Sequence, residues 1–145
     1  MAEKMTRQAA LAFLKKHGLG VLSTVDNLGR PEAAVVEYSE TDRFEIIFDT
    51  SIAFRKYPNL RRNPQVAFVV GWDDGRTLQI EGTARELEGD ELLAAQRIHK
   101  AKLSDVEKFE RRSDIRYFKI TPTWARYCDF SVDPWELTEV ALSNE

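Results

Sequence analysis

Residues 44–72 have the sequence FEIIFDTSIAFRKYPNLRRNPQVAFVVGW, in which two apolar runs flank a positively charged segment. The runs 44–50 and 65–72 are rich in β-branched and aromatic residues, which predicts two strands. The segment between them has helical character, but Pro58 lacks a backbone donor and clashes with the preceding turn. We therefore expect a strand, an irregular helix and a strand in succession, with the helix kinked or split near Tyr57.

Strand signals continue on both sides of this stretch. Two turn sequences, D-N-L-G ending at Gly29 and D-D-G ending at Gly75, are typical of β-hairpins. The remaining predicted strands cover residues 19–25, 31–38, 76–87, 116–122 and 124–130.

Two further helices are expected. The first spans about residues 6–17, with Thr6 as the N-cap and Gly18 in the left-handed position after the helix. The second spans about residues 90–102 and begins at Asp90 as its cap. Its predicted inward-facing residues are Leu93, Ile98 and Ala101.

These elements predict a mainly β fold, a six- to seven-stranded antiparallel barrel with small helices at the gaps. The strands follow one another in adjacent pairs, without the regular strand-helix-strand alternation of a layered α/β fold. The 145 residues contain no repeat and no linker-like segment, so we expect one domain over residues 1–145.

Composition narrows the range of functions. The chain is 43% hydrophobic and 31% charged, and its net charge of −3 argues against general affinity for nucleic acid or anionic membranes. It has no apolar run of the roughly 20 residues that span a bilayer, and its first residues lack a signal-peptide pattern. A single cysteine, Cys128, cannot form an intramolecular disulfide. We therefore expect a cytoplasmic protein.

The clearest local electrostatic feature lies between Thr50 and Trp72, where no acidic residue occurs and four basic ones do. Thr50 and Ser51 stand at a strand-to-helix junction, where free backbone N–H groups and the helix dipole favour phosphate. Arg55 and Lys56 follow within about one turn and could add charge-assisted hydrogen bonds. The residues alone leave two other interpretations open: solvated helix charges, including Arg61 and Arg62, or a nucleic-acid patch.

The ordered set of motifs resembles the pyridoxamine 5′-phosphate oxidase-like split barrels. The central part is the run FDTSIAFRKYPNLRRNPQVAF, in which a strand ending in Thr precedes an Arg-Lys pair, Asn-Leu and Asn-Pro. It is accompanied by S-T-V-D-N-L-G-R-P before it, and by E-G-T-A-R-E-L and P-T-W-A-R-Y after it. The likeness covers roughly residues 7–130 and implies an FMN-binding split β-barrel.

In that family FMN lies in a groove between two protomers, which implies a homodimer here. The resemblance assigns the FMN phosphate to Thr50, Ser51, Arg55 and Lys56, and backbone contacts to Val35, Val36 and Glu37. On strand 76–87, Thr77, Gln79 and Glu81 share the face opposite the apolar one, so Thr77 or Gln79 could reach the flavin edge. Trp124, with Arg126 beside it, could contact the flavin or substrate from the partner's side. The alternative for Trp124 is a packing or interface aromatic, and the alternative for Gln79 is a residue on an exposed strand face.

Three departures from the family pattern affect the expected activity. Pyridoxamine phosphate oxidases carry an Arg and a Lys on the second strand, where this chain has AAVVEY, and a C-terminal segment that binds the vitamin B6 phosphate, which this chain lacks. Phe54 replaces the small hydroxyl residue that usually precedes Arg-Lys. We therefore expect no oxidation of vitamin B6 phosphates.

The expected function is that of an FMN-dependent oxidoreductase acting on a small molecule. The alternatives are a non-enzymatic flavin-binding, sensor or storage module, or a relative that binds a deazaflavin or heme. His17 and His99 are far apart and only one cysteine is present, so no metal-ligand spacing exists and no metal site is expected. Cys128 has no neighbouring base, which favours a small buried thiol over a nucleophile.

Overall fold

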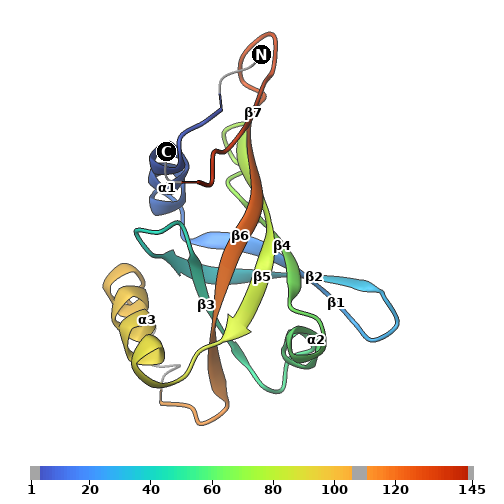
Figure 1. Ribbon diagram of the computed structural model, residues 1–145, viewed down its shortest axis with the longest axis vertical. Helices are drawn as coiled ribbons and strands as arrows, with labels where there is room; N and C mark the ends of the chain where they lie inside the picture. Colours follow the sequence, from blue (N-terminus) through green and yellow to red (C-terminus); the bar gives the residue numbers. More distant parts are fainter. Residues whose placement is uncertain (1–3, 106–110, 144–145) are drawn as a thin grey trace.

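The computed structural model describes residues 4–105 and 111–143, and it confirms the predicted mainly β architecture (Figure 1). One antiparallel sheet has the strand order β3-β2-β1-β4-β5-β6-β7, and β3 also pairs with β6. That pairing closes six strands into a barrel and leaves β7 as an extra strand on β6. The strands are β1 (Leu19–Val25), β2 (Pro31–Glu40), β3 (Ile46–Ser51), β4 (Gln65–Val70), β5 (Arg76–Glu86), β6 (Ile115–Asp129) and β7 (Glu136–Glu139).

Three helices lie around the barrel: α1 (Arg7–Lys15), α2 (Lys56–Arg62) and α3 (Gly89–Lys102). In Figure 1, α2 and α3 flank one end of the barrel and α1 lies nearer the other end. The β6–β7 hairpin extends beyond the barrel at the end nearer α1. None of the described helices has the length and apolar content that a bilayer crossing requires.

Both predicted hairpins are present, and local turn chemistry explains them. In the β1–β2 turn the Asp26 carboxylate accepts hydrogen bonds from the backbone N–H groups of Leu28 and Arg30, and Gly29 has a φ of 78°. In the β4–β5 turn Gly75 has a φ of 80°. Glycine adopts these left-handed conformations without the steric cost that a Cβ brings.

The barrel interior is filled by alternate residues of every strand. On β5, Leu78, Ile80 and Ala84 are buried, as the alternation predicted. The helix α1 packs on the core through buried residues that include Leu14, and the Tyr38 hydroxyl donates a 2.7 Å hydrogen bond to the Leu14 carbonyl. Because this hydroxyl has a buried partner, Tyr38 can be fully buried without loss of hydrogen bonding.

The prediction of two closing strands was wrong, because β6 runs unbroken from Ile115 to Asp129. The register of β6 against β5 shifts between Glu81 and Gly82, so that Thr123 is an extra residue on β6. This β-bulge absorbs the residue and lets the strand continue. The short β7 was not predicted, since its sequence ELTE has no apolar alternation.

The helix details also differ from the predictions. Thr6 caps α1 as expected, but the C-cap is Lys16 in a right-handed conformation, and Gly18 has no positive φ. The second helix begins only at Lys56, so Pro58 lies in its first turn, where the missing N–H has no intrahelical acceptor and breaks no hydrogen bond of α2. The residues before Lys56 form a turn instead of a helix.

The helix α3 begins one residue earlier than predicted, with Glu88 as its N-cap, so Asp90 lies inside the first turn. Its buried residues are Ala95 and His99; Ile98 is half-buried, Ala101 is exposed and Leu93 is 52% exposed. The predicted inward face was therefore wrong for Leu93 and Ala101. The face of α3 that packs on the sheet carries the small residue Ala95 and His99, which contacts Ser39. The apolar residues of the helix alone do not identify this face.

Candidate functional site

Most of the predicted phosphate and backbone residues line one hollow of about 300 Å³, which we call the β2–β3 hollow. Its lining residues come from β2, the end of β3, the turn before α2, the start of α2 and the start of β6. The residues that line it are Val35, Val36, Glu37, Asp49, Thr50, Ser51, Phe54, Lys56 and Ile115. Arg55 is exposed and does not line this hollow.

Lys56 is the cation of the β2–β3 hollow. Its side chain begins α2 and is only 8% exposed. In the described part of the chain no carboxylate lies within 4 Å of its ammonium group, whose nearest aromatic contact is the Phe54 ring, 4.8 Å from Nζ to the centroid. Burial lowers the pKa of Lys56, and the more distant Glu32 carboxylate offsets this in part. A nearly buried ammonium group with no paired carboxylate is well placed to bind an anion.

The two hydroxyl groups at the end of β3 have different roles. Ser51 Oγ donates to Asp114 Oδ2 at 2.6 Å and accepts a hydrogen bond from the Ala53 backbone N–H at 3.1 Å. The Arg112 guanidinium and the Ser51 hydroxyl hold the pKa of Asp114 below its ordinary value, so Asp114 stays ionised. Thr50 Oγ1 has only a long contact, 3.5 Å, with the Ser51 carbonyl. Thr50 therefore has a hydroxyl available to a ligand, while Ser51 holds the turn.

The expected helix N-terminus is not located at Thr50 and Ser51. A turn separates Ser51 from Lys56, and the following helix has only seven residues. The helix dipole therefore contributes less to this site than the sequence indicated. The attraction for an anion depends on Lys56 and Thr50.

Two acidic residues also line the β2–β3 hollow, and the sequence analysis did not identify Asp49 as a site residue. Asp49 Oδ2 lies 3.4 Å from Nε2 of the buried His99, and Glu37 lies on β2 across the hollow. The segment after Thr50 is free of acidic residues, but Asp49 directly precedes it on β3, and Glu37 lines the hollow from the neighbouring strand β2. A phosphate group fits the donors Lys56 and Thr50, with weaker net attraction than an Arg-Lys pair would provide.

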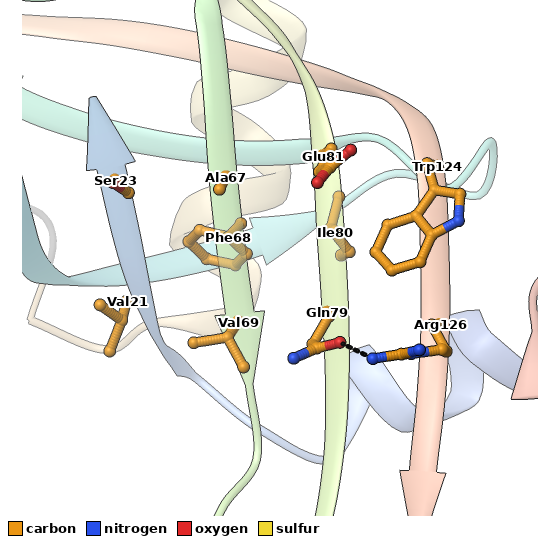
Figure 2. Close-up of a pocket in the computed structure, with 10 residues that line it drawn as sticks. All are labelled: Val21, Ser23, Ala67, Phe68, Val69, Gln79, Ile80, Glu81, Trp124 and Arg126. Carbon is orange, nitrogen blue, oxygen red and sulfur yellow. Dashed lines mark hydrogen bonds between the residues drawn. The ribbon is translucent and has the colours of Figure 1, made fainter. Parts of the chain in front are cut away.

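Gln79, Trp124 and Arg126 lie on a second hollow of about 410 Å³, the outer-face hollow, over β1, β4, β5 and β6 (Figure 2). Gln79 Oε1 accepts a hydrogen bond of 3.2 Å from Arg126 Nη2, and the Arg126 guanidinium lies 5.7 Å from the Trp124 ring centroid. Thr77 is half-buried on β5 and lines neither hollow. The hollow is lined by Val21, Ser23, Ala67, Phe68, Val69, Gln79, Ile80, Glu81, Trp124 and Arg126.

The histidines and the cysteine are not part of either hollow. His99 is buried, with Nδ1 2.7 Å from the Ser39 hydroxyl, and His17 packs on the Phe13 ring. Cys128 is free and buried, as predicted. Among residues 4–105 and 111–143, no group of three or more histidine, cysteine, aspartate or glutamate side chains is arranged to hold a metal ion.

Comparison with known proteins agrees with the sequence motifs and the barrel. A family model described as pyridoxamine 5′-phosphate oxidase matches residues 6–129. A pyridoxine/pyridoxamine 5′-phosphate oxidase of Klebsiella pneumoniae is 33% identical over 70 residues, which are 48% of this chain and 32% of that protein. The matched part is therefore about a third of that relative's length.

Solved structures show the same fold at low sequence identity. A heme-binding protein from Mycobacterium smegmatis superposes with a TM-score of 0.80 and 19% identity, covering 96% of this chain and 60% of that one. HutZ, the heme storage protein of Vibrio cholerae, has a TM-score of 0.63 and 19% identity, covering 80% and 89%. These two likenesses establish the fold alone.

Proposed function

This chain belongs to the pyridoxamine 5′-phosphate oxidase family, and from that premise we propose that it binds FMN and acts as an FMN-dependent oxidoreductase on a small molecule. We propose further that it works as a homodimer with the flavin held between the two copies. In this arrangement the β2–β3 hollow of one protomer receives the phosphate, and the outer face of the other contacts the flavin ring.

The observation that carries the proposal is the environment of Lys56. Its ammonium group is nearly buried, has no carboxylate within 4 Å in the described residues, and shares a hollow with the Thr50 hydroxyl. A charged group in that position is stabilised by an anion that accepts hydrogen bonds from both side chains. The phosphate of FMN is such an anion.

The other residues would hold and shield the flavin. The β2 backbone at Val35, Val36 and Glu37 borders the hollow, and Gln79 and Trp124 offer an amide and an aromatic ring on the outer face. FMN would supply the electron or hydride transfer, and the protein would supply orientation and exclusion of water.

Heme is the second candidate, because two structures with this fold are those of a heme-binding and a heme storage protein. Heme iron is commonly held by an axial histidine. Here His99 is buried and in contact with Ser39, and His17 packs on Phe13; neither lines the two hollows. The side chains therefore support FMN better than heme.

The test compares FMN with riboflavin, which lacks only the phosphate. We expect Lys56→Met to weaken FMN binding about 10- to 150-fold, the equivalent of one charged hydrogen bond of about 1.5–3 kcal/mol, and to leave riboflavin binding nearly unchanged. Methionine preserves most of the buried volume. Arg62→Met is the matched control, because Arg62 is exposed and lies outside the hollow.

Flavin fluorescence titration at fixed ionic strength measures all these affinities, and Arg55→Ala belongs in the same series. Because Arg55 is exposed, we expect a smaller effect there than at Lys56. Equal losses of FMN affinity in the variants at residues 55, 56 and 62, which become smaller as the salt concentration rises, would indicate general electrostatic attraction instead of a specific phosphate site. An absorption spectrum that shows heme binding and no flavin binding would overturn the proposal in favour of the second candidate.

Turnover separates an enzyme from a flavin store or sensor. We expect the FMN-loaded protein to be reduced by NAD(P)H or another donor and to pass the electrons to an acceptor repeatedly. Stable FMN binding without any such turnover would favour the non-enzymatic alternative.

A further inference from the structure

His99 is a buried imidazole that lies behind one wall of the β2–β3 hollow. It is 1% exposed, on the face of α3 that packs on the sheet. Its Nδ1 atom lies 2.7 Å from the Ser39 hydroxyl, and its Nε2 atom lies 3.4 Å from Asp49 Oδ2. The second contact lacks hydrogen-bond geometry, so Nε2 has no hydrogen-bond partner in the described part of the chain. A buried polar atom without a partner requires a physical explanation.

The surrounding groups indicate that the imidazole proton is on Nε2. Ser39 is fully buried, and among the described residues His99 Nδ1 is the acceptor within reach of its hydroxyl. When this hydroxyl donates to Nδ1, the proton is on Nε2, next to the Asp49 carboxylate. The opposite tautomer would leave the hydroxyl without an acceptor and would place a lone pair beside a negative charge. Ser39, His99 and Asp49 therefore form a series that ends in a carboxylate with a buried N–H donor behind it.

Asp49 connects this buried series to the β2–β3 hollow. Its side chain is 22% exposed and lines the hollow together with Thr50 and Lys56. The contact with His99 involves Oδ2 alone, so Oδ1 is available to accept hydrogen bonds from a ligand. A carboxylate repels a phosphate, so the ligand group that Asp49 suits is an uncharged donor such as a hydroxyl.

The position of Asp49 indicates which hydroxyl groups these are. Asp49 directly precedes Thr50 on β3, and Thr50 and Lys56 are the donors that the proposed function gives to the FMN phosphate. In FMN the ribityl chain, which carries free hydroxyl groups, joins the phosphate to the flavin ring. A flavin whose phosphate is bound by Thr50 and Lys56 therefore brings hydroxyl groups to the same hollow.

We propose that Asp49, held in place by the buried His99, accepts hydrogen bonds from the ribityl hydroxyls of the flavin. His99 is a positioning residue, because its Nε2–H holds the Asp49 carboxylate at the wall while the Ser39 hydroxyl holds the imidazole. A hydroxyl bound at the free oxygen keeps the carboxylate against Nε2, so the buried donor gains its partner when the site is occupied. The inference rests on the proposed FMN function and adds a site for the part of the ligand between the phosphate and the ring.

Two flavins without a phosphate isolate this contact from the phosphate site. Riboflavin has the ribityl hydroxyls, whereas lumiflavin has a methyl group in place of the ribityl chain, so the ratio of their dissociation constants reports the hydroxyls. We expect Asp49→Ala to weaken riboflavin binding at least about tenfold, the effect of losing one hydrogen bond to a charged group. Lumiflavin binding should change by less than about threefold. Fluorescence titration at fixed pH and ionic strength measures both constants.

Glu37→Ala is the matched control, because Glu37 also lines the hollow but is exposed, whereas Asp49 is held by His99. Both substitutions remove one negative charge from the same hollow, so both change its general electrostatic potential in the same direction. We expect the riboflavin-to-lumiflavin ratio of Glu37→Ala to stay within about threefold of the parent ratio. Equal changes in the two variants would indicate a general effect of charge and would overturn the assignment of Asp49.

Two substitutions at residue 99 test the positioning role. Glutamine keeps an N–H donor, whereas leucine removes it and preserves most of the buried volume. We expect His99→Leu to change the riboflavin-to-lumiflavin ratio as much as Asp49→Ala does, with no further change in the double variant, and His99→Gln to keep most of the parent's preference. Each ratio compares two ligands on one protein, so it does not depend on the fraction of a variant that is folded. A merely structural role for His99 would weaken the binding of both flavins alike.

The phosphate and the hydroxyls are measured by separate ratios. An unchanged riboflavin-to-lumiflavin ratio in Asp49→Ala would overturn this inference alone, because the FMN-to-riboflavin ratio of Lys56→Met still reports the phosphate site. Additive changes in the double variant would overturn the positioning role of His99. A parent protein that binds no flavin would overturn the proposed function and this inference together.

Discussion

Arg55 and Lys56 are neighbours in the sequence but lie in different environments. Arg55 is exposed to solvent, whereas the Lys56 side chain is nearly buried beside Thr50 and under the Phe54 ring. Phe54, which replaces a small hydroxyl residue of the family pattern, therefore shields the ammonium group from water. The same pair of basic residues thus supplies one site cation and one solvated charge.

The protonation of Lys56 should control FMN affinity at alkaline pH. Burial lowers its pKa from the ordinary value of 10.5, and a bound phosphate favours the charged form. We expect the FMN dissociation constant, divided by that of riboflavin, to rise with pH, beginning below pH 10.5. Binding should take up a proton in this window.

Lys56→Met removes the titrating group, so its affinity ratio should not show the alkaline rise. The same pKa shift makes an opposite contribution to folding. Because the unfolded chain holds the proton more tightly, this group's contribution to stability increases as pH rises through the window. Parallel pH dependence in the parent and Lys56→Met would contradict the assignment of Lys56 to the phosphate.

At the scale of secondary-structure elements, the β5–β6 pair shows how a single glycine keeps a long strand continuous. Gly82 stands at the register shift, and a Cβ added there would lie 2.4 Å from the Thr121 carbonyl oxygen, a backbone atom. The backbone of β6 would have to move, and β6 carries Trp124 and Arg126 on the outer-face hollow.

We expect Gly82→Ala to lower the free energy of unfolding by at least about 2 kcal/mol, because the clash is with backbone. Gly29→Ala is the control: it also loses a glycine, at a φ of 78°, but a Cβ there meets no atom within 4 Å. Its expected cost is about 1 kcal/mol. Urea unfolding of both variants gives the comparison, and an equal or smaller cost at Gly82 would contradict the argument.

At the scale of the whole molecule, the distribution of charge around the site sets the expected substrate range. The second strand carries the carboxylates Glu32 and Glu37 and no basic residue. Glu37 lines the β2–β3 hollow, and Glu32 accepts a 3.0 Å hydrogen bond from Asn59, which lies on the buried side of α2. Both carboxylates would repel a second phosphate near the proposed flavin site.

We therefore expect no turnover of pyridoxine or pyridoxamine 5′-phosphate above the rate seen with free FMN. The measurement is formation of the aldehyde product with saturating FMN, with the Klebsiella pneumoniae oxidase as the positive control. Steady turnover of either compound would show that the missing basic residues are replaced by groups elsewhere in the chain.

The predictable parts of the site were those that depend on nearby residues. The segment from Thr50 to Lys56 was identified as a unit because its hydroxyl and basic residues are contiguous. The carboxylates of Glu37 and Asp49 were not identified as walls of the same hollow. Asp49 directly precedes Thr50 on β3, whereas only the antiparallel pairing of β2 with β3 brings Glu37 to the hollow.

The sequence by itself determined the strand and hairpin pattern and the family motifs, because turn residues such as Gly29 and Gly75 and the period-2 alternation act over a few residues. Only the tertiary structure decided that β6 continues past Thr123, that α3 buries His99 in place of Leu93, and that Lys56 but not Arg55 enters the hollow. Each of these depends on contacts with another strand or helix. Burial, register and pairing are properties of two distant segments together, and local chemistry does not specify them.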